Sequence, residues 1–410
     1  MNEHWRKLLG LFLALGLVAS ACGDDGDDTS TEADDDTTTT ESSETDETTD
    51  TTEDTDETTD TTEGDGEAAA PDLAAVCPAS IVIQTDWFPE AEHGALYELI
   101  GDDYTIDADA KRVSGNMVLG GEELGVTFEI RAGGPAIGTG SVGAEMYVDD
   151  EITLGYATTD GQVLRYEETP LLSVVAPLET NPQIIYWDPE TYPEIETLAD
   201  LGEAGVTINV FPGGTFADVF VAQGIWNEDQ IDPSYDGSPG RFVAEGNIAQ
   251  QGFASAEPWL YQNQIEDFGR ELAYETLNDA GFQVYSQTVA IRPDDLETLR
   301  PCLEELVPVI QQATVDYYAD PAATNALIVE TVEAYDTFWT YPAELAEFSA
   351  QIQIDEGFAG NGDDSTVGNM DEARVQTVLD AMTAAEMDVP ADLTVADLIT
   401  NEFIDDSIGF

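Results

Sequence analysis

The chain of 410 residues contains 86 acidic and 11 basic residues, which gives a formal net charge of −75 at pH 7. This balance excludes nucleic-acid binding, because phosphate backbones require clustered Lys and Arg side chains. Much of the acidic excess lies beyond the N-terminal tract, which indicates a solubility adaptation and says little about chemistry.

The first residues have the pattern of a targeting signal. Arg6 and Lys7 precede an apolar stretch that is too short to span a bilayer. Residues 19–22 (Ala-Ser-Ala-Cys) then resemble the lipobox of bacterial lipoproteins, which are cut just before a Cys that becomes lipidated. We therefore expect a signal peptide over residues 1–21. Acyl chains such as palmitate on Cys22 would anchor the protein to the outer face of the cytoplasmic membrane.

An acidic, Thr-rich tract follows the predicted lipidation site. Residues 23–70 contain no basic residue and no large apolar residue. Such a composition cannot bury enough apolar surface to offset the entropy of ordering the chain, and repulsion between its carboxylates keeps it extended. We expect residues 22–76 to form a disordered tether between the lipid and the folded part. The Thr density also allows O-glycosylation.

Two cysteines, Cys77 and Cys302, remain beyond the lipidated one. Outside the cytoplasm an even pair predicts a disulfide, and no spacing of ligands suggests a metal site. Cys77 precedes the first predicted strand, whereas Cys302 begins a late helix. If the two pair, the chain has returned to the domain in which it started.

The first predicted strand, over residues 81–84, runs into an aromatic turn. The sequence Asp-Trp-Phe-Pro places Trp87 and Phe88 where this strand ends. Glu90 and Glu92 follow, and their charges favour a helix N-terminus. In an α/β sheet, ligands bind at this junction between the carboxyl end of a strand and the next helix. The alternative is that both aromatic residues belong to the core.

The helix after this turn is expected to carry His93 and Tyr97 on one face, because they are four residues apart. The turn, the His and the Tyr together resemble the opening motif of bacterial ABC-transporter substrate-binding proteins. The resemblance is closest to the branch that carries thiamine-pyrimidine precursors, which is related to the nitrate, sulfonate and taurine binders. It implies that Trp87, Phe88, His93 and Tyr97 contact a flat heterocycle. The two Glu residues of the turn stand where that branch more often has Asn.

Strand-like and helical runs alternate along the rest of the chain, which favours an α/β fold with largely parallel sheets. Further strands are predicted over residues 126–130, 154–157, 172–175, 183–187, 206–211 and 283–291. Helices are predicted over residues 216–224, 256–267, 301–319, 321–339 and 371–382. An insertion around residues 102–123 departs from the resemblance, in which a helix leads directly to the second strand.

The order of these segments resembles a two-lobed binding protein that closes around its ligand. Residues 181–187 resemble the first crossing between lobes, residues 193–202 the start of the second lobe, and residues 285–291 the return crossing. The resemblance implies a type II periplasmic-binding-protein-like fold, each lobe a mixed, mostly parallel sheet flanked by helices. The expected boundaries are residues 77–182 and 288–410 for lobe I, and residues 183–287 for lobe II.

Turns after predicted strands supply further candidate ligand contacts. Gly213 and Gly214 let the backbone approach a ligand, and Thr215 can cap the next helix and expose N–H donors. A tight strand-to-helix turn explains the same residues. Gly134 lies in a similar turn, next to Arg131. This Arg either pairs with an anionic ligand or belongs to a surface ion pair.

Glu257 precedes Pro258, as a Glu precedes Pro in the second lobe of the thiamine-precursor branch. The resemblance implies a carboxylate that accepts two hydrogen bonds from the edge of an aminopyrimidine. The alternative is a solvated Glu that opens a helix with Pro at its first position. Trp259, Tyr156 and Asp160 complete the candidate contacts.

The sequence gives no support for catalysis. His93 is the only His beyond the first turn of the leader, and no nucleophile motif accompanies it. Zinc sites need more His or Cys residues than remain, so we expect neither a metal nor another cofactor. The predicted protein is a monomeric, non-enzymatic, lipid-anchored receptor that delivers a small ligand to an ABC permease. The resemblance implies a ligand such as a hydroxymethyl- or formylamino-pyrimidine.

Three alternatives remain open. The ligand could instead be a sulfonate, taurine, nitrate or riboflavin, because helix N-termini bind small anions without basic residues. Fungal relatives of the fold are enzymes that make the thiamine pyrimidine with an active-site His and iron, but they carry a cluster of cysteines that this chain lacks. A solute sensor that imports nothing is the third alternative, which a permease and an ATPase encoded beside this chain would argue against.

Overall fold

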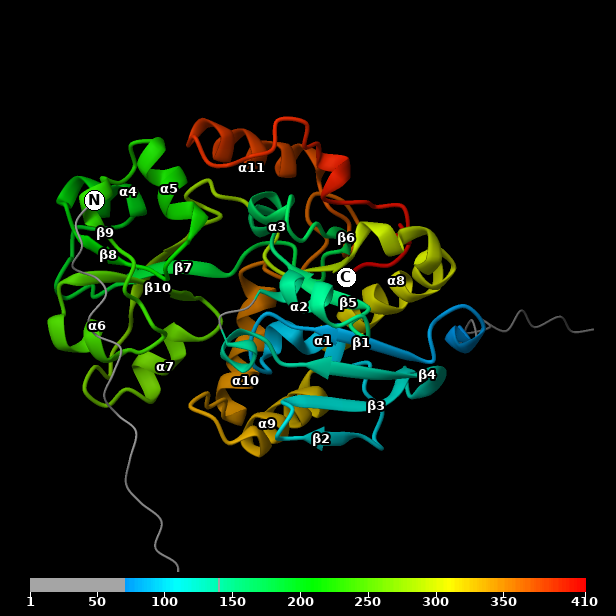
Figure 1. The fold of residues 1–410 in the computed structure, drawn as a ribbon. Helices are drawn as coiled ribbons and strands as arrows, with labels where there is room; N and C mark the ends of the chain where they lie inside the picture. The colour runs from blue at the N-terminus through cyan, green and yellow to red at the C-terminus, as the bar shows by residue number, and fades with distance from the viewer. Residues whose placement is uncertain (1–70, 139–140) are drawn as a thin grey trace, which may run out of the picture. The chain divides into compact units, whose positions relative to one another are not determined.

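Residues 71–138 and 141–410 are described by the computed structural model (Figure 1). The predicted signal peptide, the lipidation at Cys22 and the tether as far as residue 70 lie outside the described residues. The predicted end of the tether at residue 76 is wrong. Leu73–Ala75 form a 3-10 helix whose first turn is capped by the Asp72 side chain, and Leu73 is fully buried. The composition argument overlooked this single apolar anchor.

The first of two mixed sheets has the strand order β2-β3-β4-β1-β5-β12-β6. At its centre, β1 (Ser80–Gln84) runs parallel to β4 (Glu122–Arg131) and to β5 (Leu154–Ala157). β12 (Thr288–Ile291) returns from late in the chain and lies antiparallel between β5 and β6 (Leu172–Val175). A strand that follows the whole second sheet in sequence therefore lies within the first sheet.

The predicted insertion is a β-hairpin. β2 (Thr105–Asp107) and β3 (Arg112–Leu119) continue the first sheet antiparallel beyond β4. The polar and apolar residues of β4 alternate, as expected for a strand with one buried face. The hairpin thus widens the sheet where the family pattern has a helix.

The second sheet has the strand order β11-β7-β10-β8-β9. β10 (Ile248–Phe253) lies at its centre, antiparallel to β7 (Gln183–Trp187) and parallel to β8 (Thr207–Asn209). The edges are β11 (Ala273–Thr276) and β9 (Ile231–Asp232). Both sheets have fewer parallel pairs than the alternation of helices and strands predicts, because the hairpin, β12, β7 and β11 all run against their neighbours.

Short helices follow the strands, and long helices fill the C-terminal third of the chain. They are α1 (Gly94–Tyr97), α2 (Val142–Val148), α3 (Thr159–Arg165), α4 (Leu198–Ala204), α5 (Thr215–Ala222), α6 (Gly240–Glu245), α7 (Glu257–Asn263), α8 (Leu296–Ala319), α9 (Ala322–Tyr335), α10 (Ala343–Asp355) and α11 (Glu372–Ala384). The 3-10 helices after the first are η2 (Ala91–His93), η3 (Gly134–Ile137), η4 (Glu228–Gln230), η5 (Pro293–Asp295) and η6 (Val395–Asp397). None of the helices among the described residues has the length and apolar character needed to span a bilayer.

Several predicted elements are shorter in the structure, and two of them show a local reason. The predicted helix over residues 321–339 ends at Tyr335, because Asp336 adopts a left-handed conformation with φ of 47°. The predicted strand over residues 283–291 is a strand only from Thr288. The carbonyl groups of Gln283 and Val284 instead accept hydrogen bonds from Arg374.

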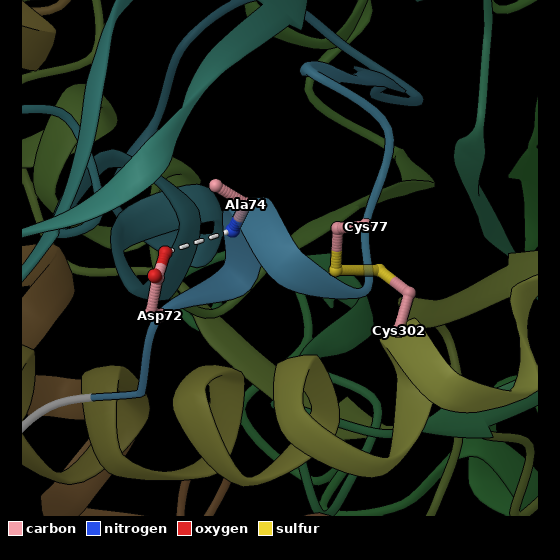
Figure 2. The surroundings of a disulfide bond; sticks show 4 residues. All are labelled: Asp72, Ala74, Cys77 and Cys302. Atoms are coloured by element: carbon pink, nitrogen blue, oxygen red, sulfur yellow. Dashed lines mark hydrogen bonds between the residues drawn. A yellow bond between two sulfur atoms is a disulfide. The ribbon is translucent and has the colours of Figure 1, made fainter.

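The core of the first sheet lies against α8. Leu303, Leu306 and Ile310 recur at helical spacing on this helix and pack in one cluster with Ile81 and Ile83 of β1. The predicted disulfide joins the segment before β1 to the same helix through Cys77 and Cys302, which are 225 residues apart (Figure 2). The late helix α8 is thus fixed to the beginning of the folded part.

We call the first sheet and the helices packed on it the first lobe, and the second sheet with α4 to α7 the second lobe (Figure 1). The chain passes between them at residues 176–182 and 277–287, the crossing segments. Arg374 of α11 ties these segments together. It donates hydrogen bonds to the carbonyl oxygens of Glu179, Gln283 and Val284, and its guanidinium lies 3.9 Å from the centre of the Tyr285 ring.

Candidate functional site

A cavity of about 360 Å³ lies between the two lobes. Residues that follow the carboxyl ends of β1 and β5 line one side, and the turns after β8 and β10 line the other. Asn181 and Gln287 of the crossing segments also contribute. The cavity therefore occupies the position that the sequence predicts for a ligand.

Some of the candidate ligand contacts do line this cavity, namely Trp87, Asp160, Gly213, Gly214, Thr215 and Glu257. Thr215 opens α5, and its hydroxyl donates a hydrogen bond to the carboxylate of Asp160 on the other lobe. Glu257 opens α7 and accepts a 2.6 Å hydrogen bond from the backbone N–H of Phe253. Both lobes thus place predicted residues at the same cavity.

Trp87 forms an aromatic corner with a residue that the sequence analysis missed. Its ring lies edge-to-face against Trp339, with centroids 6.0 Å apart and planes at 87°. Trp339 also lines the cavity, and its indole N–H donates a 3.2 Å hydrogen bond to the carbonyl of Pro89. Trp339 lies between α9 and α10, far from the opening motif in sequence, so no local signal could have linked the two.

Gly134 supports this corner without lining the cavity. It adopts a φ of 55°, and a Cβ atom there would lie 2.4 Å from Cε3 of Trp87. Only a residue without a side chain allows the indole to pack so closely on the backbone. The predicted ligand contact at Gly134 is therefore corrected to a contact with Trp87.

Phe88 and Tyr97 of the opening motif belong to the core. Phe88 is buried with Ala132 and Tyr335, and its ring lies edge-to-face against Trp87, which lines the cavity. Tyr97 ends α1 and joins the core cluster of the first sheet. For Phe88 the core alternative is therefore the one observed, and both residues are corrected from ligand contacts to packing residues.

His93 lies behind the cavity wall. Its ring is fully buried, with Nε2 located 2.9 Å from Oδ1 of Asp86 and 3.7 Å from Oε1 of Glu90. Tyr156 is buried in the core of the first sheet, with its ring centroid 5.3 Å from that of His93. Neither residue lines the cavity. His93 contacts the carboxylates that line it, so we correct its role from ligand contact to positioning residue.

Trp259 also misses the cavity. It lies two residues after Glu257 on α7, and residues at that spacing point to different faces of a helix. Glu257 faces the cavity, whereas Trp259 packs against the core cluster of the first lobe. The predicted contact is thus replaced by a packing contact between lobes.

Several carboxylates line the cavity, and the sequence analysis did not assign most of them to the ligand site. Asp86, Glu90 and Glu92 line the cavity from the first lobe, whereas their pattern had predicted only a favourable helix start. Ser255 of the second lobe donates a hydrogen bond to Glu92. Gln287 donates to Asp86, with its Nε2 at 3.2 Å from Oδ2. These Asp and Glu residues were visible in the sequence, but in so acidic a chain they could not be distinguished from the many acidic residues on the surface.

Burial makes these carboxyl groups hard to ionise. Burial, with a smaller contribution from the negative charge of Glu92, raises the pKa of Glu257 from 4.5 to about 7. The pKa of Glu90 is raised well above its ordinary value by burial and then by Glu92, Asp86 and Glu257. Burial also raises the pKa of Glu92, although the hydrogen bond from Ser255 partly offsets this. Glu90, Glu92 and Glu257 therefore hold their protons to higher pH than solvated carboxyl groups do.

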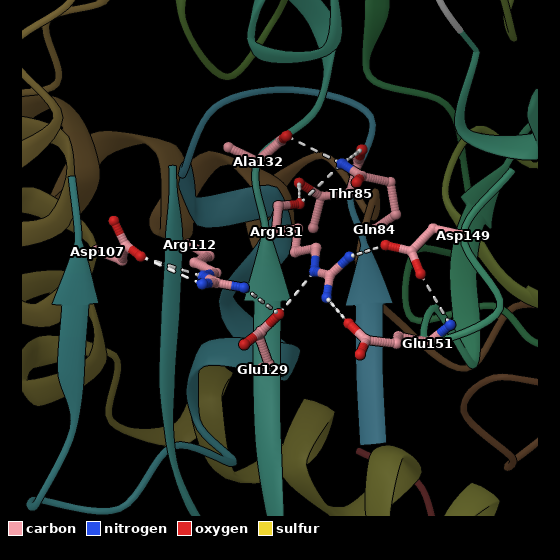
Figure 3. A network of polar contacts seen from close by, with 9 residues as sticks. All are labelled: Gln84, Thr85, Asp107, Arg112, Glu129, Arg131, Ala132, Asp149 and Glu151. Carbon is pink, nitrogen blue, oxygen red and sulfur yellow. Dashed lines mark hydrogen bonds and ion pairs between the residues drawn. The ribbon is translucent and has the colours of Figure 1, made fainter. Parts of the chain in front are cut away.

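Basic side chains are absent from the described residues that line the cavity. Arg131, the candidate partner of an anionic ligand, forms surface ion pairs instead (Figure 3). Its guanidinium nitrogens lie 2.6 Å from Glu129, 2.8 Å from Asp149 and 3.3 Å from Glu151. Among the described residues that line the cavity, no Lys or Arg therefore balances the carboxyl groups.

The carboxylates are also too dispersed to bind a metal ion. Over residues 71–138 and 141–410, no group of three or more His, Cys, Asp or Glu side chains is placed to hold one. The cavity instead presents separated acceptors around an aromatic corner. This arrangement suits a ligand with several atoms in contact with the wall.

No family model and no curated protein matches the chain. Among solved structures, the alkanesulfonate-binding protein SsuA from Xanthomonas axonopodis pv. citri, bound to MOPS, is similar with a TM-score of 0.50 and 16% identity, over 79% of this chain and 98% of that one. The periplasmic nitrate-binding protein NrtA from Synechocystis PCC 6803 has a TM-score of 0.49 and 12% identity, over 79% and 87%. A protein from Bordetella bronchiseptica RB50 has a TM-score of 0.49 and 17% identity, over 80% and 96%.

At these identities the similarity to the alkanesulfonate-binding protein concerns the fold. The chain has the two-lobed α/β fold of periplasmic binding proteins, as the sequence analysis predicts. The ligand has to be argued from the cavity itself, because a fold hosts many binding specificities.

Proposed function

We propose that the chain is the extracytoplasmic solute-binding component of an ABC importer, anchored to the cell membrane through lipid on Cys22. Its ligand would be a small flat heterocycle rich in hydrogen-bond donors, such as an aminopyrimidine precursor of thiamine. The observation that carries the proposal is the cavity between the lobes, which combines the corner of Trp87 and Trp339 with Glu90, Glu92 and Glu257.

The size and walls of the cavity support a single small ring. A volume of about 360 Å³ is at the low end of the range for small-molecule sites. Aromatic side chains favour stacked or edge-to-face contacts with a flat ligand. The carboxylate of Glu257 can accept hydrogen bonds from an amino group on the ring edge, as the resemblance to the thiamine-precursor branch implies.

The charge of the cavity argues against sulfonate, taurine and nitrate as ligands. An anion between Glu90, Glu92 and Glu257 would be repelled by each of these groups that ionises, in a partly desolvated space where Coulomb repulsion is strong. No Lys or Arg among the described lining residues would offset this repulsion. The enzyme alternative requires a His in contact with the ligand, and His93 lies behind the wall.

The proposed mechanism is closure of the lobes around the ligand. Contacts made only in the closed state shift the equilibrium between open and closed forms, and a permease can recognise the closed form. In this chain, the hydrogen bonds from Ser255 to Glu92 and from Thr215 to Asp160 join the lobes. A ligand that bridges Trp87 and Glu257 would add to these bonds.

A thermal-shift screen of the purified protein tests this function. The panel contains hydroxymethyl- and formylamino-pyrimidines, riboflavin, taurine, an alkyl sulfonate and nitrate. A ligand at about a hundred times its dissociation constant stabilises the folded state by about 2.7 kcal/mol. We expect a pyrimidine to raise the melting temperature.

Two Trp variants locate the binding. The pyrimidine shift should vanish in Trp87→Ala and persist in Trp226→Phe, which changes a Trp that packs in the core of the second lobe and does not line the cavity. A shift with sulfonate or nitrate alone would retain the receptor but reject the heterocycle. A pyrimidine shift that survives Trp87→Ala would place binding outside this cavity.

A further inference from the structure

We infer that the cavity selects an organic cation, with a positively charged nitrogen of the ligand held in the corner of Trp87 and Trp339 and neutralised by Glu90 and Glu257. This inference rests on the proposed function and narrows its ligand class. It separates a charged ligand from a neutral ring that offers only hydrogen-bond donors.

The charge balance across the cleft is the first argument. Asp86, Glu90 and Glu92 come from the first lobe and Glu257 from the second, so closing the lobes brings together carboxyl groups whose ionised forms repel one another. The cavity-lining residues of the described chain contribute no Lys, Arg or His to balance them. A neutral ligand satisfies hydrogen bonds but leaves this repulsion, whereas a cation between the carboxylates converts it into attraction.

The second argument is a hydrogen-bond acceptor in the cavity wall that has no donor. It does not depend on the number of carboxylates. Gln287 is only 8% exposed and lines the cavity, yet its Oε1 has no hydrogen-bond partner among the described residues. A buried amide oxygen without a hydrogen-bond donor destabilises the folded state, unless a ligand supplies the donor. The ligand is thus expected to bring an N–H or polarised C–H group to this oxygen.

The aromatic corner is the third argument. The planes of Trp87 and Trp339 meet at 87°, so two indoles border one space from perpendicular directions. A cation within about 6 Å of an indole face is attracted by the ring quadrupole, and Trp is the strongest partner for this interaction. Glu90, whose side chain is 14% exposed, lies 3.7 Å from Nε2 of the buried His93, and no Lys or Arg is among the described residues that line the cavity. The corner and this carboxylate together suit an ammonium, an amidinium or an N-alkylated ring.

Matched sets of probes test the charge directly. One set shares a pyridine ring: 1-methylnicotinamide is cationic, nicotinamide neutral and nicotinate anionic. A second set pairs choline with its neutral isostere 3,3-dimethylbutanol. Dissociation constants are measured by calorimetry on the purified protein at pH 7.5. We expect at least one cation to bind ten or more times more tightly than its neutral partner, and nicotinate to bind most weakly in its set.

Isosteric variants test whether the preference for a cation arises in the cavity. Glu90→Gln should weaken binding of the preferred cation about tenfold or more while leaving its neutral partner within about twofold. Glu98→Gln is the matched control, because Glu98 also has a pKa raised by burial but does not line the cavity. Its effect on either probe should stay within about twofold.

The outcomes separate this inference from the proposed function. If no cation binds more tightly than its neutral or anionic partner, the inference is wrong. If, in addition, a neutral pyrimidine binds and Trp87→Ala abolishes that binding, the receptor function stands without the charge. A cation that binds equally well to Glu90→Gln and to the unchanged protein would also overturn the inference, because other residues would then recognise its charge.

Discussion

Ser255 of the second lobe donates a hydrogen bond to Glu92 of the first, and both side chains are buried. The bond crosses the cleft beside the cavity, so it exists only when the lobes are together. It also holds a carboxylate whose pKa burial raises. Closure and the electrostatics of the site are therefore linked through one pair of residues.

Removing this bond should favour the open form. A hydrogen bond to a charged group contributes about 1.5–3 kcal/mol, so Ser255→Ala should weaken ligand binding about tenfold or more. Ser349→Ala is the control, because Ser349 is buried in α10 and bonds within that helix. Small-angle scattering and calorimetry would detect the change. Unaltered affinity in Ser255→Ala would mean that the bond does not contribute to closure.

Gly134 is expected to control the aromatic corner without contacting the ligand. Gly134→Ala places a Cβ on Trp87 and forces a side chain into a left-handed backbone conformation. We expect a loss of about 1–3 kcal/mol in the free energy of unfolding and a clear loss of ligand affinity. Gly120→Ala is a control for backbone strain alone, since its φ is 57° and its surroundings are open. Equal affinity in both variants would contradict a supporting role for Gly134.

The stability of the protein should fall as pH rises through neutrality. Glu257 has a pKa of about 7 when folded against 4.5 for the free group, so between these values the folded state holds more protons than the unfolded state. Stability from this carboxyl is present below pH 4.5 and is lost as pH rises toward 7. Glu90 shifts in the same direction.

Glu257→Gln isolates this effect. The variant should flatten the pH dependence of the free energy of unfolding by up to about 1.4 kcal/mol per pH unit between pH 5 and 7. Denaturant titrations at a series of pH values measure the slope. An unchanged slope would show that the carboxyl group of Glu257 ionises normally in the folded protein.

Arg374 should determine the rigidity of the crossing segments. Its guanidinium satisfies three backbone carbonyls and stacks on Tyr285, so Arg374→Ala should cost about 3 kcal/mol of unfolding free energy. Arg374→Lys should recover little, because an ammonium lacks the planar fork. Arg300→Ala, which removes ion pairs to exposed carboxylates, should cost less than about 1 kcal/mol. Hydrogen exchange faster only at residues 176–182 and 277–287 would locate the effect, whereas unchanged exchange there would refute it.

The disulfide is expected to stabilise the first lobe without affecting the ligand site. Cross-linking residues 225 apart removes much of the freedom of the unfolded chain, so Cys302→Ser should lower the free energy of unfolding by about 2–5 kcal/mol. Neither cysteine lines the cavity, so ligand affinity should stay the same. Denaturant unfolding with and without a reductant, followed by calorimetry, tests both statements. A large loss of affinity in the variant would contradict the second.

Strands with continuous apolar runs were predictable from the sequence, and those with polar interiors were not. The bounds predicted for β5, β6 and β7 match the structure. β10, at the centre of the second sheet, was missed because Gln250 and Gln251 interrupt its apolar pattern. Gln250 is buried where its amide bonds the hydroxyl of Tyr186, a contact that only tertiary structure provides.

The residues of the candidate site also divide into those that a local pattern predicts and those that only tertiary structure brings together. The position of Trp87 followed from the end of a strand, a local feature. Its partner Trp339 and the convergence of Glu90 with Glu257 depend on segments more than 150 residues apart, which no local pattern relates. For Phe88, the orientation of one side chain in a turn decided between core and cavity, and the sequence left both open.

The interleaved order of the two sheets also sets the order in which a growing chain can fold. Every strand of the second sheet lies between residues 183 and 276, so that lobe can form as soon as this segment is available. The first sheet is completed only by β12, which starts at Thr288, and by the helix bearing Cys302, both of which follow the inserted segment. Until then the edges of β5 and β6 that pair with β12 stay unpaired, whereas the strand that leads to Trp87 already lies between β4 and β5. Trp339 of the cavity comes later still. The ligand site is therefore among the last parts of this protein to exist, completed by residues made long after its first aromatic side chain.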